Sequence, residues 1–267
     1  MSNKLISILV LNYNNSKLLN RSINSCINQT YRNLEVLIFD DKSNDNSVQI
    51  LKNIKKKHKI KFFVNKRDKF GEAALDAKNG YMTLLKHAKG EIIFLLDSDD
   101  YFKKDKVQQV VNFFRKNRKI ELIQDLPLIK KKNKFRNQEN KNNFLSFWPY
   151  FSPESCISFK RKFVIKFNKA NYNFSNEFEY KNVWLGFRLC AYSYFIRKSF
   201  YSLNKNLTIY ESQGESKKYK IFRLNWFIRR LNSFNYLKKI SKNRINLNYN
   251  YDFLITTIFI KFLNLFK

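Results

Sequence analysis

The chain has 267 residues, of which 44% are hydrophobic and 17% aromatic, enough to form a core and to exclude general disorder. Fifty-two Lys and Arg against 21 Asp and Glu give a formal net charge of +31, so we expect attraction to polyanions such as nucleic acid, an anionic membrane or phosphorylated substrates. The three cysteines are far apart and in no CxxC spacing, which argues against a disulfide framework or zinc site and favours a reducing, cytoplasmic setting.

The positive charge has a compositional alternative. Lys, Asn, Ile and Phe are all abundant, and a nucleotide bias would raise them together. The apolar run Leu5 to Leu11 near the N-terminus is too short for the apolar region and cleavage site of a signal peptide, or for a membrane span. We therefore expect a chain that is not exported.

Apolar runs alternate with helical periodicity through the first hundred residues. The apolar runs at 6–11 and 91–96 predict buried strands, and the segments 34–39 and 60–64 predict two further strands. The segments between them carry apolar residues at helical spacing, and the third of these helices is expected over 73–88. This βαβαβ order predicts one α/β domain with a doubly wound, mostly parallel sheet of the Rossmann-like type.

The second half is less regular. A helix is expected over 103–114 and a further strand within 120–128. The Lys- and Asn-rich stretch 130–143 predicts a solvated loop, with a lid over a binding site as the alternative. Trp148, close to two prolines, is either a core residue or a ring that stacks on an acceptor sugar.

From residue 217 onward the pattern becomes basic and helical. Six apolar residues can share one helical face, namely Leu224, Phe227, Ile228, Leu231, Phe234 and Leu237. The last segment, 253–266, is strongly apolar but too short to span a bilayer. We therefore divide the chain into a domain over 1–216 and a basic amphipathic helical extension over 217–267, which either lies in a membrane interface or packs on the domain.

Polar clusters follow three of the predicted strands, at 12–16, 40–45 and 97–100. In doubly wound sheets, ligands bind beyond the carboxyl ends of the strands. Acidic groups at the ends of buried strands are costly unless a cation meets them. Because Mg²⁺ and Mn²⁺ often use one or two carboxylates and complete their shell with phosphate oxygens and water, the run from Asp97 to Asp100 predicts a cation that holds a diphosphate. The alternative is a plain turn rich in Asp and Ser.

Four segments, in order, resemble motifs of the family 2 glycosyltransferases, which share the GT-A fold. Residues 6–14 resemble the first strand of the family, and 29–35 (QTYRNLE) match its "QTY.N.E" connection. Residues 40–45 (DDKSND) are similar to "DDGS.D", and 90–100 (GEIIFLLDSDD) to "GE.I.fLD.DD". The resemblance covers about residues 4 to 190 and implies a GT-A type sheet with a nucleotide-sugar donor.

The resemblance also implies roles for single residues. Asp41 would hydrogen-bond the nucleobase, Asp99 would contact ribose or metal, and Asp100 would bind the Mn²⁺ or Mg²⁺ that bridges the diphosphate. Lys42 stands where the family usually has Gly. The remaining residues that we expect to contact the nucleotide-sugar are Asn12, Tyr13, Lys78 and Asp97.

An inverting transfer needs a general base to deprotonate the acceptor hydroxyl. The family places this carboxylate in an "ED" pair shortly before a helix that here resembles 183–189. Alignment on Trp184 puts Glu179 at the Glu and Tyr180 at the Asp, so the usual base is absent in register. Glu179 and Glu177 are therefore the candidate bases.

Together these features predict a metal-dependent, inverting glycosyltransferase. It would move a sugar from a nucleoside-diphosphate sugar, with UDP favoured, to a glycan or lipid-linked acceptor in cell-surface polysaccharide synthesis, as a peripheral protein on the inner face of the plasma membrane. Two alternatives stay open: an inactive nucleotide-binding relative, favoured by Tyr180, and a charge-driven polyanion-binding protein. Nucleic acid is disfavoured because the basic residues are scattered and no recognisable nucleic-acid-binding motif is present.

Overall fold

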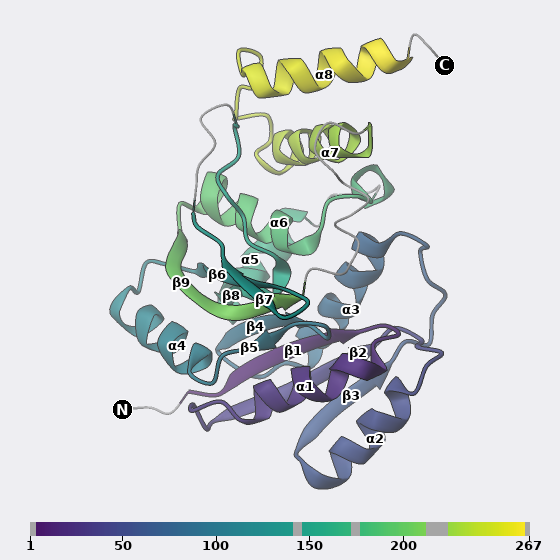
Figure 1. Cartoon of the computed structure of the whole chain (residues 1–267). Helices are drawn as coiled ribbons and strands as arrows, with labels where there is room; N and C mark the ends of the chain where they lie inside the picture. Colours follow the sequence, from purple (N-terminus) through teal and green to yellow (C-terminus); the bar gives the residue numbers. More distant parts are fainter. Residues whose placement is uncertain (1–3, 141–145, 172–176, 212–223, 265–267) are drawn as a thin grey trace.

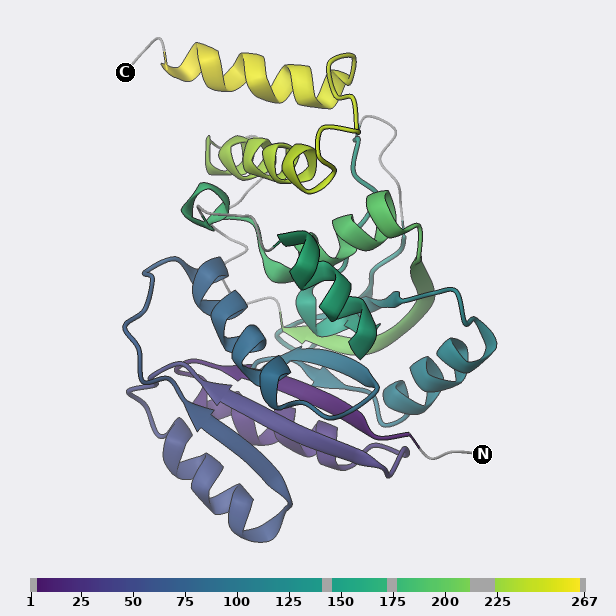
Figure 2. The same cartoon turned by 180° about the vertical axis from the view of Figure 1, so that it is seen from behind.

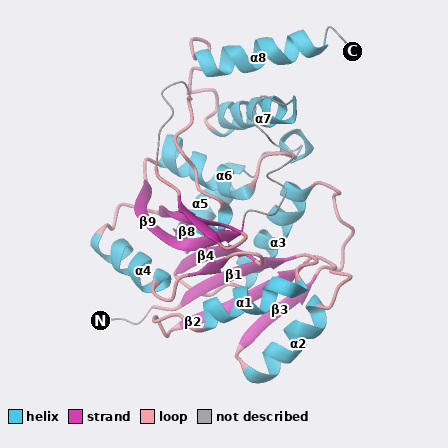
Figure 3. Ribbon diagram, viewed as in Figure 1, coloured by secondary structure: helices cyan, strands magenta, loops and turns pink. Residues whose placement is uncertain are grey.

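The computed structural model describes residues 4–140, 146–171, 177–211 and 224–264 (Figure 1). Helices cover both faces of one twisted sheet, and two further helices extend the molecule at one end (Figure 3). The strands are β1 Ile6–Asn12, β2 Leu34–Asp40, β3 Ile60–Val64, β4 Ile92–Asp97, β5 Tyr101–Phe102, β6 Leu122–Lys131, β7 Lys134–Asn137, β8 Ile157–Lys160 and β9 Phe200–Glu211. The helices are α1 Ser16–Ile27, α2 Ser47–Lys57, α3 Ala73–His87, α4 Lys106–Lys116, α5 Arg161–Asn171, α6 Leu185–Ala191, α7 Leu224–Ile240 and α8 Tyr251–Asn264, with 3₁₀ turns η1 Glu154–Cys156 and η2 Glu177–Tyr180 and a π-helical segment η3 Tyr192–Arg197.

The nine-stranded sheet has the order β3-β2-β1-β4-β8-β6-β9-β5, with β7 paired to β6. The first four strands are all parallel, as the alternation of strands and helices predicts. Beyond β4 the sheet is mixed, because β8 runs antiparallel to both β4 and β6 while β9 runs parallel to β6. The strand order reverses between β1 and β4, so the switch point of this sheet lies where those two strands end.

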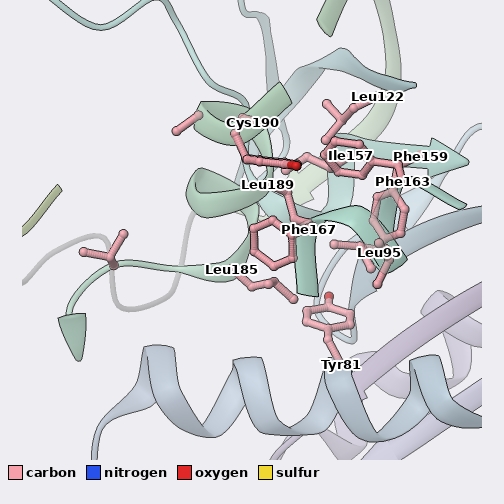
Figure 4. Close-up of a cluster of buried hydrophobic side chains, with 14 of the residues drawn as sticks. Tyr81, Leu95, Leu122, Ile157, Phe159, Phe163, Phe167, Leu185, Leu189 and Cys190 are labelled. Carbon is pink, nitrogen blue, oxygen red and sulfur yellow. The ribbon is translucent and has the colours of Figure 1, made fainter. Parts of the chain in front are cut away.

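Two hydrophobic cores lie on opposite faces of the sheet. Alternate residues of β1 point to opposite faces, so Ile8 packs with α1, α2 and α4 while Leu9 packs with α3, α5 and α6. In the second core, Tyr81 of α3 points toward Leu95 and Phe167 (Figure 4). Burial on both faces explains why these central strands are continuous apolar runs in the sequence.

The stretch 130–143 corrects one expectation, because part of it is a β-hairpin. β6 continues to Lys131 and turns into β7, with Leu128 paired to Asn137. Lys132 in the turn adopts the left-handed conformation (φ 55°). All four side chains of β7 are exposed, so no apolar alternation in the sequence marks this strand. Residues 141–145 lie outside the described part of the chain.

The helix expected from residue 103 begins three residues later, at Lys106, because β5 and the turn after it occupy the positions before it. Trp148 is 8% exposed and packs against Phe187 and Phe234. It therefore belongs to the core, which decides against the acceptor-stacking alternative.

The C-terminal extension forms two helices (Figures 1 and 2). Phe234 and Leu237 of α7 are buried in the same core as α3 and α6, and α8 packs on the outer side of α7. The predicted division at residue 216 falls within 212–223, outside the described residues, and stays a prediction. Within the described ranges, no helix is both long and apolar enough to cross a membrane.

Candidate active site

The three polar clusters predicted to share one edge of the sheet do meet there. The register pairs Asn12 with Asp40 and Leu11 with Asp97. Asn12 Nδ2 donates to Asp40 Oδ2 at 2.7 Å, and the backbone N–H of Asp41 donates to the carbonyl of Asn12 at 2.9 Å. Asn15 Nδ2 links the first cluster to the third through Ser98 Oγ at 3.1 Å. The carboxyl ends of β1, β2 and β4 are thus tied into one polar site at the switch point.

Asp41 lies in a small group of polar residues at the end of β2. Its Oδ1 accepts a hydrogen bond from Asn65 Nδ2 at 2.6 Å, and its Oδ2 is 3.3 Å from Lys69 Nζ. Lys69 Nζ also lies 3.0 Å from the centre of the Tyr13 ring, which is 54% exposed. Lys42, at the position where the resemblance has Gly, does adopt a left-handed φ of 56°. Lys69 therefore links the Asp41 carboxylate to the exposed ring of Tyr13.

Asp97 and Asp99 form part of a carboxylate cluster at the end of β4. Asp97 Oδ1 accepts the Tyr81 hydroxyl at 2.9 Å, and its backbone N–H donates to Ser155 Oγ at 3.0 Å. Burial, reinforced by the Asp99 carboxylate, raises the pKa of Asp97 to about 7. Burial also raises the pKa of Asp99. These raised pKa values mean that ionisation of all the carboxyl groups in the cluster is unfavourable in the absence of a cation.

Asp100 is the most enclosed member of this cluster, with no exposed surface. Its Oδ1 accepts the Glu211 backbone N–H at 2.8 Å, whereas its Oδ2 is buried without a hydrogen-bond partner. Burial, followed by the charges of Asp99 and Asp97, holds its pKa well above the usual range. A divalent cation would supply the missing partner for Oδ2 and neutralise the cluster.

The residues fit the cation that the resemblance implies. Across the described ranges, no three His, Cys, Asp or Glu side chains converge into a complete ligand set. Mg²⁺ and Mn²⁺ need only one or two protein carboxylates when phosphate oxygens and water supply the rest. Asp100, with its partnerless oxygen, and the neighbouring Asp99 can provide that number.

Glu211, at the end of β9, is a site residue that sequence reasoning missed. It accepts hydrogen bonds from Arg21 Nη1 at 2.7 Å and Lys130 Nζ at 2.9 Å. These hydrogen bonds outweigh partial burial and lower the pKa of Glu211. Arg21 Nη2 also donates to the Asp99 carbonyl at 2.7 Å. Two cations from α1 and β6 are thereby brought to the carboxylate cluster, and no local pattern in the sequence announces this.

A buried ion pair between Lys106 and Asp125 is linked to the carboxylate cluster. Lys106 Nζ is 2.8 Å from Asp125 Oδ1, and both side chains have no exposed surface. Lys106 also donates to Thr208 Oγ1 at 2.6 Å and to the Ser155 carbonyl at 2.7 Å. Since Ser155 Oγ accepts from the Asp97 backbone, Lys106 is connected through one residue to the end of β4.

Glu154 is a further buried carboxyl, and no pattern in the sequence singles it out. Its Oε1 accepts the backbone N–H of Gly186 at 2.6 Å, while its Oε2 is buried without a partner. Burial and the nearby Asp97 charge raise its pKa to about 8. A Cβ on Gly186 would lie 2.6 Å from Glu154 Cγ, so the glycine allows this close contact. Glu154 thus joins η1 to the start of α6.

The candidate bases lie on η2, at the boundary with α7. The Glu179 side chain is 51% exposed and lies 3.8 Å from Lys239 Nζ. Tyr180 is buried and packs against Tyr236 of α7, so it fills core space where the resemblance expects a carboxylate. Glu177 opens the same 3₁₀ turn, and its side chain lies outside the described part.

Lys78, the basic residue proposed for the nucleotide, is half-buried on α3, one turn before Tyr81. The structure therefore brings together Asn12, Tyr13, Asp41, Asp97, Asp99 and Asp100 at the carboxyl edge. Glu179 lies on a separate element, η2, which contacts α7.

Comparison with known proteins gives an independent result. The family model described as "Glycosyl transferase family 2" matches residues 7–203. A glycosyltransferase of Haemophilus influenzae with no assigned substrate is 38% identical over 118 residues, which is 44% of this chain and 45% of that protein. The UDP-Glc:alpha-D-GlcNAc-diphosphoundecaprenol beta-1,3-glucosyltransferase WfaP of Escherichia coli is 34% identical over 110 residues, 41% of each chain. The matched segment thus spans less than half the length of these relatives.

Among solved structures, S. aureus TarS in complex with UDP superposes with a TM-score of 0.61 at 17% identity, covering 94% of this chain and 68% of that one. At this level of identity the similarity concerns the fold.

Proposed function

Because the chain belongs to glycosyl transferase family 2, we propose that it transfers a sugar from a nucleoside-diphosphate sugar to a glycan or lipid-linked acceptor in cell-surface polysaccharide synthesis. The observation that carries this proposal is the gathering of Asp41, Asp99 and Asp100 at the switch point of the sheet, with one Asp100 oxygen buried and partnerless. A UDP-linked donor is supported by the relative named for UDP-glucose.

The base of the donor would bind near Asp41, and its diphosphate would bind near the carboxylate cluster of Asp97, Asp99 and Asp100. Asp41, steadied by Asn65, would accept a hydrogen bond from an N–H on the base edge. The exposed Tyr13 ring lies beside Asp41 and would offer its face to the base once Lys69 moves aside. Lys69 could then turn toward phosphate. Asn12 would hold the loop through Asp40, and Lys78 on α3 would add positive charge near the diphosphate.

Asp99 and Asp100 would hold Mn²⁺ or Mg²⁺. When bound, this ion supplies Lewis-acid stabilisation of the departing diphosphate. Asp97 would stay oriented by the Tyr81 hydroxyl and the Ser155 hydroxyl. Arg21 and Lys130, both paired with Glu211, would keep positive charge at the rim of the cluster.

The acceptor hydroxyl would lose its proton to a carboxylate of η2. We propose Glu179 for this role, with Glu177 as the alternative. Glu179 is half-exposed, so it is accessible to an acceptor, and its carboxylate lies 3.8 Å from Lys239 Nζ. Helix α7 lies beside η2 and α8 packs on α7, which fits an acceptor delivered from the inner face of the plasma membrane.

Calorimetric titration of UDP, GDP and CDP, each with and without Mn²⁺, tests the donor class at moderate salt. Metal-dependent binding of one nucleotide is the expected result. Equal and metal-independent binding of all three would favour charge-driven polyanion binding instead. Selective binding together with no transfer to any lipid-linked or glycan acceptor would favour the inactive relative, for which the buried Tyr180 is the specific observation.

A further inference from the structure

The outer face of α8 is apolar and exposed. Five large side chains lie at positions i, i+3, i+4, i+7 and i+11, which places them within an arc of about 100° on a helix. Their exposed fractions are 82% for Tyr251, 38% for Leu254, 61% for Ile255, 64% for Ile258 and 54% for Phe262. α8 is also the outermost element of the molecule in both opposite views (Figures 1 and 2).

The inner face of α8 carries its buried polar residues. Asp252 is 9% exposed and Thr256 is 1% exposed. Asp252 forms an ion pair with Arg230 of α7, and its Oδ2 accepts the Phe147 backbone N–H at 2.9 Å. Thr256 Oγ1 donates to the Asp252 carbonyl at 2.7 Å. This amphipathicity is the reverse of what an ordinary surface helix shows.

Packing fixes α8 in this orientation. The Phe259 ring stacks on Phe227 of α7 with centroids 3.9 Å apart, and Phe253 packs on Phe234 at 5.3 Å. Rotating α8 about its axis to bury its outer face would break these ring contacts and would separate Asp252 from its ion-pair partner Arg230. The apolar face is therefore held outward by the fold, and contiguous exposed apolar patches of this kind mark interaction sites.

The net charge of the protein indicates which partner binds the apolar face of α8. The chain carries a net charge of +31, so two copies repel each other, whereas an anionic lipid surface attracts the protein. Lys242 and Arg244, exposed in the turn between α7 and α8, lie near the helix end that carries Tyr251, and Lys261 is exposed on α8 itself. Tyr249 in the same turn is 87% exposed. Tyrosines and cations beside an apolar stripe suit the boundary between headgroups and acyl chains.

We propose that α8 lies in the plane of an anionic membrane, with Tyr251, Leu254, Ile255, Ile258 and Phe262 inserted below the headgroups. Its 14 residues span about 21 Å, less than the roughly 30 Å of a bilayer core, so the helix binds along the surface. The inference deepens the proposed function and rests on it for the acceptor, which would be a lipid-linked glycan brought to the side of the molecule where α7 meets η2.

The test is co-sedimentation of the full chain with vesicles of phosphatidylglycerol and phosphatidylcholine, compared with vesicles of phosphatidylcholine alone. The variant Ile255→Ser/Ile258→Ser removes the two most exposed aliphatic side chains of the face. Ile165→Ser is the matched control, because Ile165 is 69% exposed on α5. We expect the double variant to lower partitioning to anionic vesicles by about tenfold or more, the control to leave it unchanged, and wild type to bind phosphatidylcholine weakly.

Equal vesicle binding by the double variant and wild type would overturn the proposal, since charge alone would then explain the binding. A wild type that is dimeric by light scattering, binds no vesicles and becomes monomeric in the double variant would also overturn it, in favour of a second copy on this face. UDP titration of each variant in vesicle-free buffer keeps the two proposals separate. Vesicle binding without nucleotide binding refutes the proposed reaction, and nucleotide binding without vesicle binding refutes the docking.

Discussion

Replacing Lys106 by Met should destabilise the protein strongly while keeping most of the side-chain volume. The substitution removes the positive charge that lies 2.8 Å from Asp125 Oδ1, together with hydrogen bonds to Thr208 and to the Ser155 carbonyl. Both partners of the ion pair are fully buried. Removing one partner of a buried pair costs about 3–5 kcal/mol, which corresponds to a fall of about 10 °C in Tm for a chain of this size.

The pH dependence of this loss identifies its cause. Lys106 lowers the pKa of Asp125 against the opposing effect of burial, so in the Met variant the Asp125 pKa rises further. A carboxyl whose folded-state pKa is raised contributes stability below its unfolded pKa and loses it as pH rises through the folded value. The gap between variant and wild type should therefore narrow in acid and widen toward neutral pH.

Chemical denaturation followed by circular dichroism, at several pH values, measures both effects. Lys104→Met is the matched control, because Lys104 is exposed two residues away, and it should change the unfolding free energy by less than about 0.5 kcal/mol. The double variant Lys106→Met/Asp125→Asn should be more stable than Lys106→Met alone. A loss below about 1 kcal/mol for Lys106→Met, or a gap that does not depend on pH, would refute the reasoning.

Three further outcomes concern the site, and a fourth concerns the packing of Gly90 at the start of β1. Asp100→Asn should weaken Mn²⁺-dependent UDP binding, measured by calorimetry, by about tenfold or more. The Tm without metal should stay equal or rise, because a neutral amide replaces a buried carboxyl with one partnerless oxygen. Unchanged UDP affinity would contradict the metal assignment. Because the pKa of Asp97 is raised to about 7 in the folded protein, metal-free stability should fall as pH rises from about 4 to about 7, and Asp97→Asn should flatten this slope in denaturant titrations. Glu179→Gln should lower kcat by about 100-fold without changing UDP affinity, and a kcat near wild type would transfer the role to Glu177. Gly90→Ala should cost about 2 kcal/mol or more of unfolding free energy, since its Cβ would lie 2.4 Å from the Ser7 backbone nitrogen; a cost near zero would show that β1 shifts freely.

The parallel half of the sheet could be predicted from sequence because both faces of its strands are buried. Continuous apolar runs such as 6–11 and 91–96 then coincide with β1 and β4. β7 could not be predicted, because all four of its side chains are exposed and only one of them is apolar, so the strand has no apolar alternation.

The same distinction applies to the site, where some residues could be predicted from the sequence and others could not. Asp97, Asp99 and Asp100 follow a recognisable strand, so their shared edge was predictable. Glu211 and Lys69 reach the site through contacts with residues distant in the chain, and only the folded structure pairs them with Arg21 and Asp41. For α8 the apolar content was evident from sequence, whereas its outward direction depends on Asp252 and the ring contacts with α7.

The margins of the sheet have a consequence for how the protein behaves at high concentration. β5 has only two residues, β3 carries the exposed Lys61, and β7 presents Lys134 and Arg136 to solvent. Short or lysine-bearing outer strands are poor templates for adding a strand from another molecule. We therefore expect little fibrillar aggregation of the folded chain through strand pairing.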